Sequence, residues 1–211
     1  MDNIIEKLKN RFTTKIFDSN FQIGEDVEEK IVEMFNLAPT SFGLQPFKLL
    51  KISNKKDRDA ILQISWGQKQ VVDCSLLYVL AIETDIDVVL KRYEESQVNL
   101  RKIKKEKTLE YSEFVRNFLS QRAADANFYD SWATRQMYLA LGFFLSMAAI
   151  LDIDTAPLEG FDEKKLDEIF GLNKLNLRSK ALLCIGKRFI LDEYPKLPKI
   201  RKSRSDLILD I

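Results

Sequence analysis

Apolar residues recur at the period of an α-helix in several parts of the chain. In residues 26–37, Val27, Ile31 and Met34 fall on one face of a predicted helix. Pro39 ends this helix, because the residue before a proline is pushed out of the helical region of backbone space. The same pattern predicts further helices at residues 4–9, 56–64 and 163–170.

Short apolar runs between these helices predict strands. Residues 76–82 form a nearly continuous apolar run, which is typical of a central strand buried on both faces of a sheet. Other predicted strands cover residues 47–52, 153–157 and 181–186. Helices and strands are mixed without strict βαβ alternation, and neither an internal repeat nor a Gly/Ser linker divides the chain. We therefore predict a single α+β domain over residues 1–211, with helices packed on one main sheet.

Residues 131–151 give the strongest helix signal. The segment is apolar nearly all round and includes Tyr138, Phe143 and Phe144. A helix with so small a polar face must be buried on most sides, and a subunit interface would bury it in a domain of this size.

Residues 85–122 are unusually charged, with the basic run 101–107 at their centre. Charge patterning favours a solvated helical excursion. A mobile cover over a binding site is a second interpretation, because lids come from weakly packed segments. The two interpretations are compatible.

Composition narrows the classes of function. The 33 basic and 32 acidic residues give a net charge of +1, which does not favour a nucleic-acid or anionic-membrane partner. The chain has no histidine, so Ser-His-Asp triads and HExxH zinc sites are excluded. Cys74 and Cys184 lie in apolar runs without metal-site or disulfide-framework spacing. We expect them to be reduced core residues of a cytoplasmic protein, and we expect no metal site.

Four short polar segments carry the candidate chemistry, namely residues 11–15, 38–47, 156–162 and 202–204. In the first, an arginine, two threonine hydroxyls and loop N–H groups can bind phosphate oxygens. The second offers hydroxyls and backbone groups in a loop shaped by two prolines and a glycine, and the third offers N–H groups before a capped helix. Singly, each also fits an ordinary solvated turn or tail. Together they supply what a phosphorylated ring cofactor needs.

The end of the chain combines a basic run with three apolar residues. Residues 202–204 alone are typical of a solvated basic tail. The apolar residues 207–209 instead predict that the terminus is docked as a strand rather than frayed.

In this order along the chain, the segments resemble the FMN-dependent nitroreductase family, most closely its oxygen-insensitive NAD(P)H nitroreductases. The resemblance runs from about Ile5 to the C-terminus and includes the apolar helix after Trp132. It implies a nitroreductase-like fold with a central, mainly antiparallel sheet flanked by helices. It also implies a homodimer in which the C-terminal strand extends onto the partner subunit. Two interfacial sites would each hold FMN between residues of both subunits, with NAD(P)H as the electron donor.

The resemblance assigns roles to residues of this chain. Lys15 would lie near the pyrimidine edge of the flavin and stabilise the negative charge of reduced flavin. Pro39, Thr40 and Ser41 would come from the partner subunit and line the ring. The residues that would hold the FMN phosphate are Arg11, Thr13, Lys202 and Arg204. The full set of expected cofactor-binding residues is Arg11, Phe12, Thr13, Thr14, Lys15, Pro39, Thr40, Ser41, Gly43, Gln70, Pro157, Glu159, Gly160, Lys202 and Arg204. The expected substrate-binding residues are Phe42, Gly67 and Phe118.

The sequence departs from the family pattern at the edge of the flavin. The family usually has Asn where this chain has Gly43, and Gln70 and Gly67 align with a lysine and an asparagine. Fewer polar and cationic contacts should leave reduced flavin less stabilised. The departure therefore affects the redox potential and substrate preference rather than flavin binding.

The leading hypothesis is an FMN-dependent oxidoreductase in which flavin N5, and no side chain, carries the chemistry. NAD(P)H would deliver hydride, leave, and be replaced by a nitroaromatic, quinone or flavin acceptor, giving ping-pong kinetics. Two alternatives stay open. One is a family branch with dehalogenation, enoyl-reduction or flavin-fragmentation chemistry, and the other is a non-catalytic flavin-binding dimer that has lost turnover.

Overall fold

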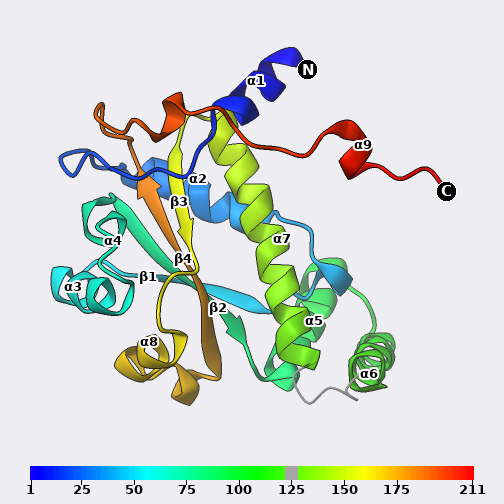
Figure 1. The fold of residues 1–211 in the computed structure, drawn as a ribbon. Helices are drawn as coiled ribbons and strands as arrows, with labels where there is room; N and C mark the ends of the chain where they lie inside the picture. Colours follow the sequence, from blue (N-terminus) through cyan, green and yellow to red (C-terminus); the bar gives the residue numbers. More distant parts are fainter. Residues whose placement is uncertain (122–127) are drawn as a thin grey trace.

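A four-stranded sheet lies at the centre of the molecule (Figure 1). The computed structural model describes residues 1–121 and 128–211; Arg122, the last residue of the predicted excursion, lies outside them. Every neighbouring pair of strands is antiparallel, which confirms the predicted sheet type. In spatial order the strands are β1 (Phe47–Lys51), β2 (Leu76–Glu83), β4 (Leu177–Gly186) and β3 (Asp154–Leu158). The four strands predicted within residues 47–186 are present, and β4 begins earlier than the pattern predicted.

Strand β2 is buried along its whole length. Successive side chains of a strand point to opposite faces of the sheet. Tyr78 and Leu80 accordingly join the core on one face, whereas Leu77 and Val79 join the core on the other. The predicted burial of this strand on both faces is confirmed.

Helices cover both faces of the sheet (Figure 1). On one face, α2 (Glu25–Asn36), α5 (Ile86–Arg101), α6 (Lys105–Gln121) and α7 (Phe128–Ile150) contribute to one hydrophobic core. On the other, the second core includes residues of α3 (Lys55–Ile64), α4 (Gln70–Asp73) and α8 (Glu163–Phe170). The remaining helical elements are α1 (Asp2–Asn10), η1 (Ser41–Gly43), η2 (Leu172–Leu175), η3 (Tyr194–Lys196) and α9 (Arg204–Leu207).

Local sequence signals set the ends of α8 as predicted. The side chain of Asp162 accepts a hydrogen bond from the backbone N–H of Lys165 at 3.1 Å. Gly171 ends the helix with a φ of 62°, a left-handed conformation that a residue without a Cβ adopts at low cost.

The C-terminal strand does not form within this chain. Leu207 is the last residue of α9, and residues 208–211 have no regular structure. Leu207 and Leu209 are 72% and 83% exposed. A strand needs the edge of another strand for its hydrogen bonds, and the terminal arm points away from the sheet (Figure 1). Pairing of this segment with a second subunit stays a prediction.

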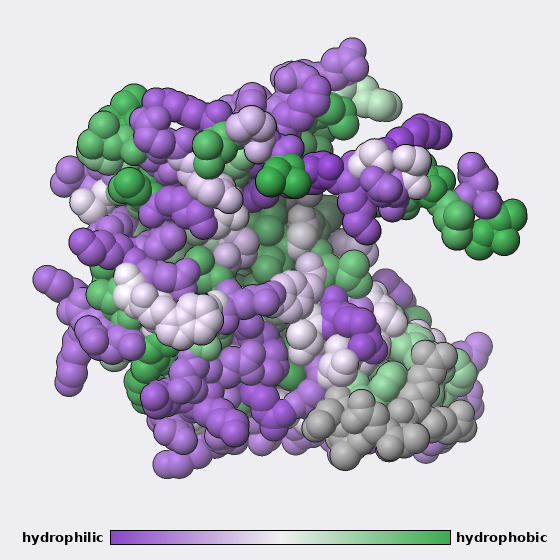
Figure 2. Space-filling model, viewed as in Figure 1, coloured by the Kyte–Doolittle hydropathy of each residue, from purple (hydrophilic) through white to green (hydrophobic). Residues whose placement is uncertain are grey.

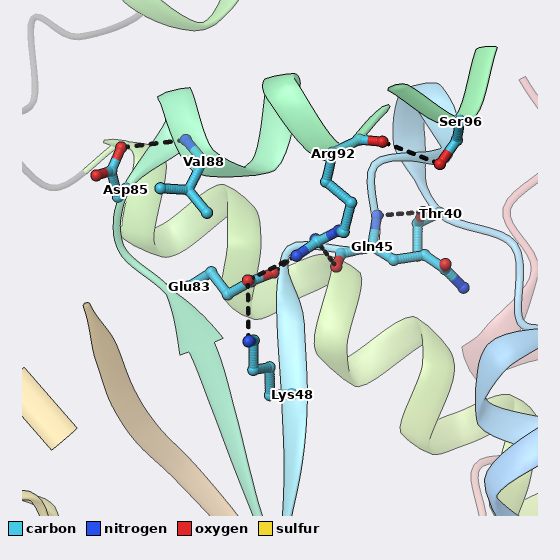
Figure 3. Close-up of polar contacts among 8 residues, drawn as sticks. All are labelled: Thr40, Gln45, Lys48, Glu83, Asp85, Val88, Arg92 and Ser96. Atoms are coloured by element: carbon cyan, nitrogen blue, oxygen red, sulfur yellow. Dashed lines mark hydrogen bonds and ion pairs between the residues drawn. The ribbon is translucent and has the colours of Figure 1, made fainter. Parts of the chain in front are cut away.

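The predicted excursion consists of two helices. α5 ends where Lys102 turns the chain with a φ of 58°, and α6 packs beside α5. A buried carboxylate fixes the start of this excursion to the sheet (Figure 3). Glu83, at the end of β2, is only 4% exposed, and its two oxygens accept hydrogen bonds of 2.7 and 2.6 Å from the guanidinium of Arg92 on α5.

The same guanidinium extends the network to the loop before β1. Arg92 donates to the carbonyl of Gln45 at 3.2 Å, and the backbone N–H of Gln45 donates to the hydroxyl of Thr40 at 3.2 Å. The excursion, the end of β2 and the loop at residues 40–45 are thereby held in one arrangement (Figure 3).

No helix in the described ranges is both long enough and apolar enough to span a lipid bilayer.

The Arg92→Ala variant should lose about 2 kcal/mol of unfolding free energy, because it leaves a buried carboxylate without its bidentate partner. Arg116→Ala is the matched control, since its partner Asp87 has a side chain 69% exposed and exposed pairs contribute about 0.5 kcal/mol. Urea unfolding of both variants measures the difference. Equal losses would show that the Glu83 network does not hold the excursion.

Candidate functional site

The first polar segment runs alongside the start of β3. Thr13 forms a parallel bridge with Thr155, and the backbone N–H of Thr14 donates to the carbonyl of Thr155 at 3.0 Å. The hydroxyls of Thr14 and Thr155 are both buried and make no hydrogen bond within the described residues. The segment therefore sits on the sheet as a fixed structure rather than as a solvated loop.

The C-terminal arm crosses this segment and encloses a cavity with it. The cavity has a volume of 620 Å³, and the arm contributes Lys199 and Arg201 to its lining. From the first segment the lining includes Arg11, Phe12 and Thr13. The structure thus brings the two ends of the chain together.

The cations in this cavity repel one another. Partial burial and the charge of Arg201 lower the pKa of Arg11. Burial and the charges of Arg11 and Arg201 lower the pKa of Lys199, although its ammonium donates to the backbone carbonyls of Leu8 and Arg11. Cations that lower one another's pKa values by repulsion would be stabilised by a bound anion.

The predicted phosphate residues Lys202 and Arg204 lie farther along the arm. Both are exposed, and Arg204 begins α9. The cations that line the cavity with Arg11 are Lys199 and Arg201, which the sequence analysis did not single out. The basic composition of residues 199–204 was the available signal, but spacing alone could not show which of these cations line the cavity.

Lys15 lies beside the same cavity. Its ammonium sits 4.9 Å from the ring centre of Tyr194, a residue of the cavity wall, and its backbone N–H donates to Asp192 at 2.7 Å. The buried Asp192, which is 5% exposed, thus fixes the backbone of Lys15. The side chain of Lys15 stays exposed.

The third polar segment begins at the end of β3 and faces α7. Pro157 and Glu159 line a cavity of 370 Å³ with Tyr138 of α7. The hydroxyl of Tyr138 donates to the carboxylate of Glu159. Burial, together with this hydrogen bond, raises the pKa of Tyr138, so the phenol stays protonated at neutral pH.

An exposed tryptophan covers Gly160. Trp66 is 80% exposed and has a φ of 55°, and a Cβ added at Gly160 would lie 2.7 Å from its ring. The Gln68 side chain donates to the carbonyl of Gly160 at 2.8 Å, so the loop before α4 is tied to the end of β3. Sequence reasoning missed Trp66 and Gln68, and the only signal for them was that they flank the predicted Gly67.

Gly67 and Gln70 take different positions in this loop. Gly67 is exposed with a φ of 69°, and a Cβ there would meet nothing within 4 Å. Gln70 is the first residue of α4 and is 9% exposed. Gln70 is therefore packed beneath the loop, whereas Gly67 lies on the surface of the loop.

The second polar segment lies against the first half of α7. The backbone N–H of Ser41 donates to the side chain of Gln136 at 2.8 Å, and Gln136 is 4% exposed. Phe42 and Gly43 both have positive φ angles, of 59° and 68°. Ser41 also lines an apolar cavity of 830 Å³ with residues 134–136, 138 and 139 of α7.

The structure brings the two predicted aromatic pocket residues together. The rings of Phe42 and Phe118 are 5.3 Å apart and meet edge to face. The excursion helix α6 therefore contacts the loop that precedes β1.

The predicted residues thus form two groups along α7. Arg11 lines a cavity of 160 Å³ together with Ala149, near the end of the helix, whereas Ser41 is hydrogen-bonded to Gln136. Thirteen residues separate these two positions of α7, which is roughly 20 Å along its axis. Tyr138 lies at the Ser41 end of this span, and it lines both the cavity of Glu159 and the cavity of Ser41.

Residues 8–187 match the sequence model of the nitroreductase family. The chain belongs to the nitroreductase family. An oxygen-insensitive NAD(P)H nitroreductase of Enterobacter cloacae is 27% identical to this nitroreductase-family chain, over 100% of both sequences. A Bacillus subtilis protein assigned as an NAD(P)H nitroreductase is 30% identical over 97% of this chain and 96% of its own length.

A solved structure supports the fold of this nitroreductase-family protein. An Exiguobacterium sibiricum protein, assigned as a nitroreductase and solved in complex with FMN, superposes with a TM-score of 0.84. The superposition covers 99% of this chain and 97% of the other, at 21% sequence identity. The nitroreductase-like fold predicted from the sequence is confirmed.

The Gly160→Ala variant should lose about 1–3 kcal/mol of unfolding free energy, because its Cβ would meet the Trp66 ring at 2.7 Å and the Gln68 amide at 2.9 Å. Gly142→Ala in α7 is the control, since a Cβ there meets nothing within 4 Å, and it should gain up to about 1 kcal/mol. Adding Trp66→Ala should restore part of the loss. Thermal unfolding measures all three, and a neutral Gly160→Ala would mean that Trp66 does not cover Gly160.

Proposed function

We propose that this nitroreductase-family protein is an FMN-dependent NAD(P)H oxidoreductase that reduces nitroaromatic, quinone or flavin acceptors. The observation that carries the proposal is the cationic cavity where the first polar segment meets the C-terminal arm. The names of its relatives support the same chemistry, since they include NAD(P)H nitroreductases and a protein solved with FMN.

The donors in this cavity suit a phosphate. Arginine can fork onto two phosphate oxygens, and lysine offers a point charge. Arg11, Lys199 and Arg201 repel one another in the protein alone, so a dianion among them would relieve that repulsion. The unpartnered hydroxyls of Thr14 and Thr155 lie in the same segment and the strand beside it. We propose that Lys202 and Arg204 add charge from the exposed end of the arm.

The protein would then orient the ring along the end of β3. Pro157, Glu159 and the backbone of Gly160 would form its floor, with Trp66 as a wall and Gln70 behind the loop. When bound, FMN supplies two-electron redox chemistry between the nicotinamide donor and the acceptor. Lys15, near the cavity, would favour the negatively charged reduced state. A single pocket that binds donor and acceptor in turn gives ping-pong kinetics.

We infer that the site is completed by a second copy of the chain. The loop with Thr40 and Ser41 lies roughly 20 Å along α7 from the end near Arg11 in the same chain, so its contribution to the ring is best supplied by a partner. Apolar residues of α7 remain uncovered in one copy, as Leu139 and Phe143 are 54% and 38% exposed. Figure 2 shows apolar surface in the hollow centre of this face, over α7 and below the C-terminal arm. A homodimer would cover it.

We further propose a cytoplasmic location, because Cys74 and Cys184 are both buried free thiols. The excursion would cover the substrate pocket, with Phe42 and Phe118 at its mouth and Gly67 on the opposite loop.

Steady-state oxidation of NADH and NADPH by the FMN-loaded protein tests the function. We expect turnover with nitroaromatic or quinone acceptors and parallel double-reciprocal plots. Turnover only with a halogenated aromatic or an enone would place the protein in another branch of flavin chemistry. A flavin-binding protein without any NAD(P)H oxidation would contradict the proposed activity.

The Arg11→Gln variant should weaken FMN binding at least tenfold, about 1.4 kcal/mol, because it removes a charged phosphate donor. Riboflavin lacks the phosphate, so its affinity should stay unchanged. Lys9→Gln is the control, since Lys9 pairs with Glu6 on the exposed side of α1. Fluorescence-quenching titrations measure the affinities, and an equal loss for both flavins would show that Arg11 does not hold the phosphate.

The Leu139→Arg variant should convert the dimer to a monomer and release its FMN, because it places a charge on the uncovered face of α7. Leu139 is 54% exposed in one chain, so the fold itself should keep its stability. Leu100→Arg on α5, at a residue 80% exposed, is the control and should remain a flavin-loaded dimer. Light scattering coupled to gel filtration measures the mass, and a dimeric, flavin-loaded Leu139→Arg would contradict this interface.

A further inference from the structure

A separate cavity lies between the two excursion helices. It has a volume of 430 Å³, which is within the range of small-molecule sites. Its lining shares no residue with the cavities near Arg11, Ser41 or Glu159. It is lined by Tyr93, Gln97, Arg101, Ile103, Lys107, Thr108 and Tyr111. Three of these belong to the basic run 101–107, which the proposed function leaves without a role.

The cavity wall contains a buried acceptor without a donor. Gln97 is 7% exposed, and its side-chain oxygen makes no hydrogen bond within the described residues. Burial of an unpartnered polar atom is unfavourable, so a ligand group that pairs with this oxygen would be stabilised there. A hydroxyl both donates and accepts, and it therefore satisfies the amide of Gln97 in either orientation.

The rest of the wall supplies positive charge and an aromatic face. Arg101 and Lys107 lie at opposite sides of the turn between α5 and α6, and neither forms an ion pair in the part of the chain that the structure describes. The rings of Tyr93 and Tyr111 are 5.8 Å apart and tilted by 31°, so they already contact each other. A ligand ring would pack on the open side of Tyr111, which is 39% exposed.

We propose that this cavity is a binding site for a small aromatic acid that carries a ring hydroxyl. The hydroxyl pairs with Gln97, the ring packs on Tyr111, and the carboxylate lies between Arg101 and Lys107. The site is accessory to the flavin site and does not depend on the proposed oxidoreductase activity.

A row of aromatic rings on α6 connects this cavity to the mouth of the proposed substrate pocket. Rings follow one another along α6 from Tyr111 through Phe114 to Phe118, and Phe118 contacts Phe42. Seven residues of helix separate Tyr111 from Phe118, which is roughly 10 Å. A ligand here is therefore close to the pocket mouth without touching the flavin ring.

Binding of para-hydroxybenzoate to the FMN-loaded protein, measured by isothermal titration calorimetry, tests the proposal. The Gln97→Leu variant should bind it roughly tenfold more weakly. Benzoate, which lacks the hydroxyl, should bind the wild-type protein about tenfold more weakly than para-hydroxybenzoate, and in Gln97→Leu the two acids should bind alike. The flavin absorption spectrum should not change, because a ligand at the flavin ring would alter it.

A second pair of variants tests the charge without altering the buried wall. Lys107→Gln should weaken binding roughly threefold, whereas Lys105→Gln, two residues earlier in α6 and outside the lining, should not. Absence of saturable binding up to about 10 mM would overturn the proposal. Equal affinity of para-hydroxybenzoate for the wild type and Gln97→Leu would also overturn it. Binding that changes the flavin spectrum would do the same, because it would place the acid at the flavin ring.

Discussion

The placement of the site depends on one helix that is apolar over most of its circumference. Helix α7 packs one side against α2 and the sheet, where the rings of Phe35 and Phe144 stack 4.6 Å apart. The chain has too few elements to cover the other side, and Leu139 stays exposed there. Because apolar surface of this kind favours being covered, we propose that the same helix that anchors the core would also direct a second copy to the site.

Electrostatics then favours one place for an anion. One cavity collects Arg11, Lys199 and Arg201 from both ends of the chain, with no acidic residue in its lining. The opposite arrangement holds the excursion, where the buried Glu83 carboxylate is matched by Arg92. The cations around Arg11 favour binding of an external anion, whereas the charge of Glu83 is neutralised within the protein by Arg92. This contrast separates a candidate binding site from a structural ion pair.

Local sequence signals were sufficient for most elements of the fold. The apolar run of β2, the helical period of α2 and the caps of α8 each predicted the observed element, because each depends on neighbours within a few residues. The C-terminal strand could not be judged in this way, since a strand exists only when another strand accepts its hydrogen bonds. The break in the excursion at Lys102 was also missed, because its left-handed φ leaves little trace in a charged sequence.

The candidate site was less accessible to sequence reasoning than the fold. The segments around Arg11 and Glu159 could be named because their residue types suit a phosphate and a ring. Trp66 was not predicted, since its contact with Gly160 arises from packing between loops far apart in the chain. The cavity-lining cations of the arm, Lys199 and Arg201, likewise depend on how the arm crosses the first segment, which spacing does not encode.

The central claim is that two copies of this chain build two FMN sites along their α7 helices. Sedimentation velocity of the protein with added FMN, followed at the protein and flavin absorption bands together, tests it most directly. The account predicts that flavin absorbance sediments with a dimer at one FMN per chain. A monomer that sediments without flavin absorbance would contradict it.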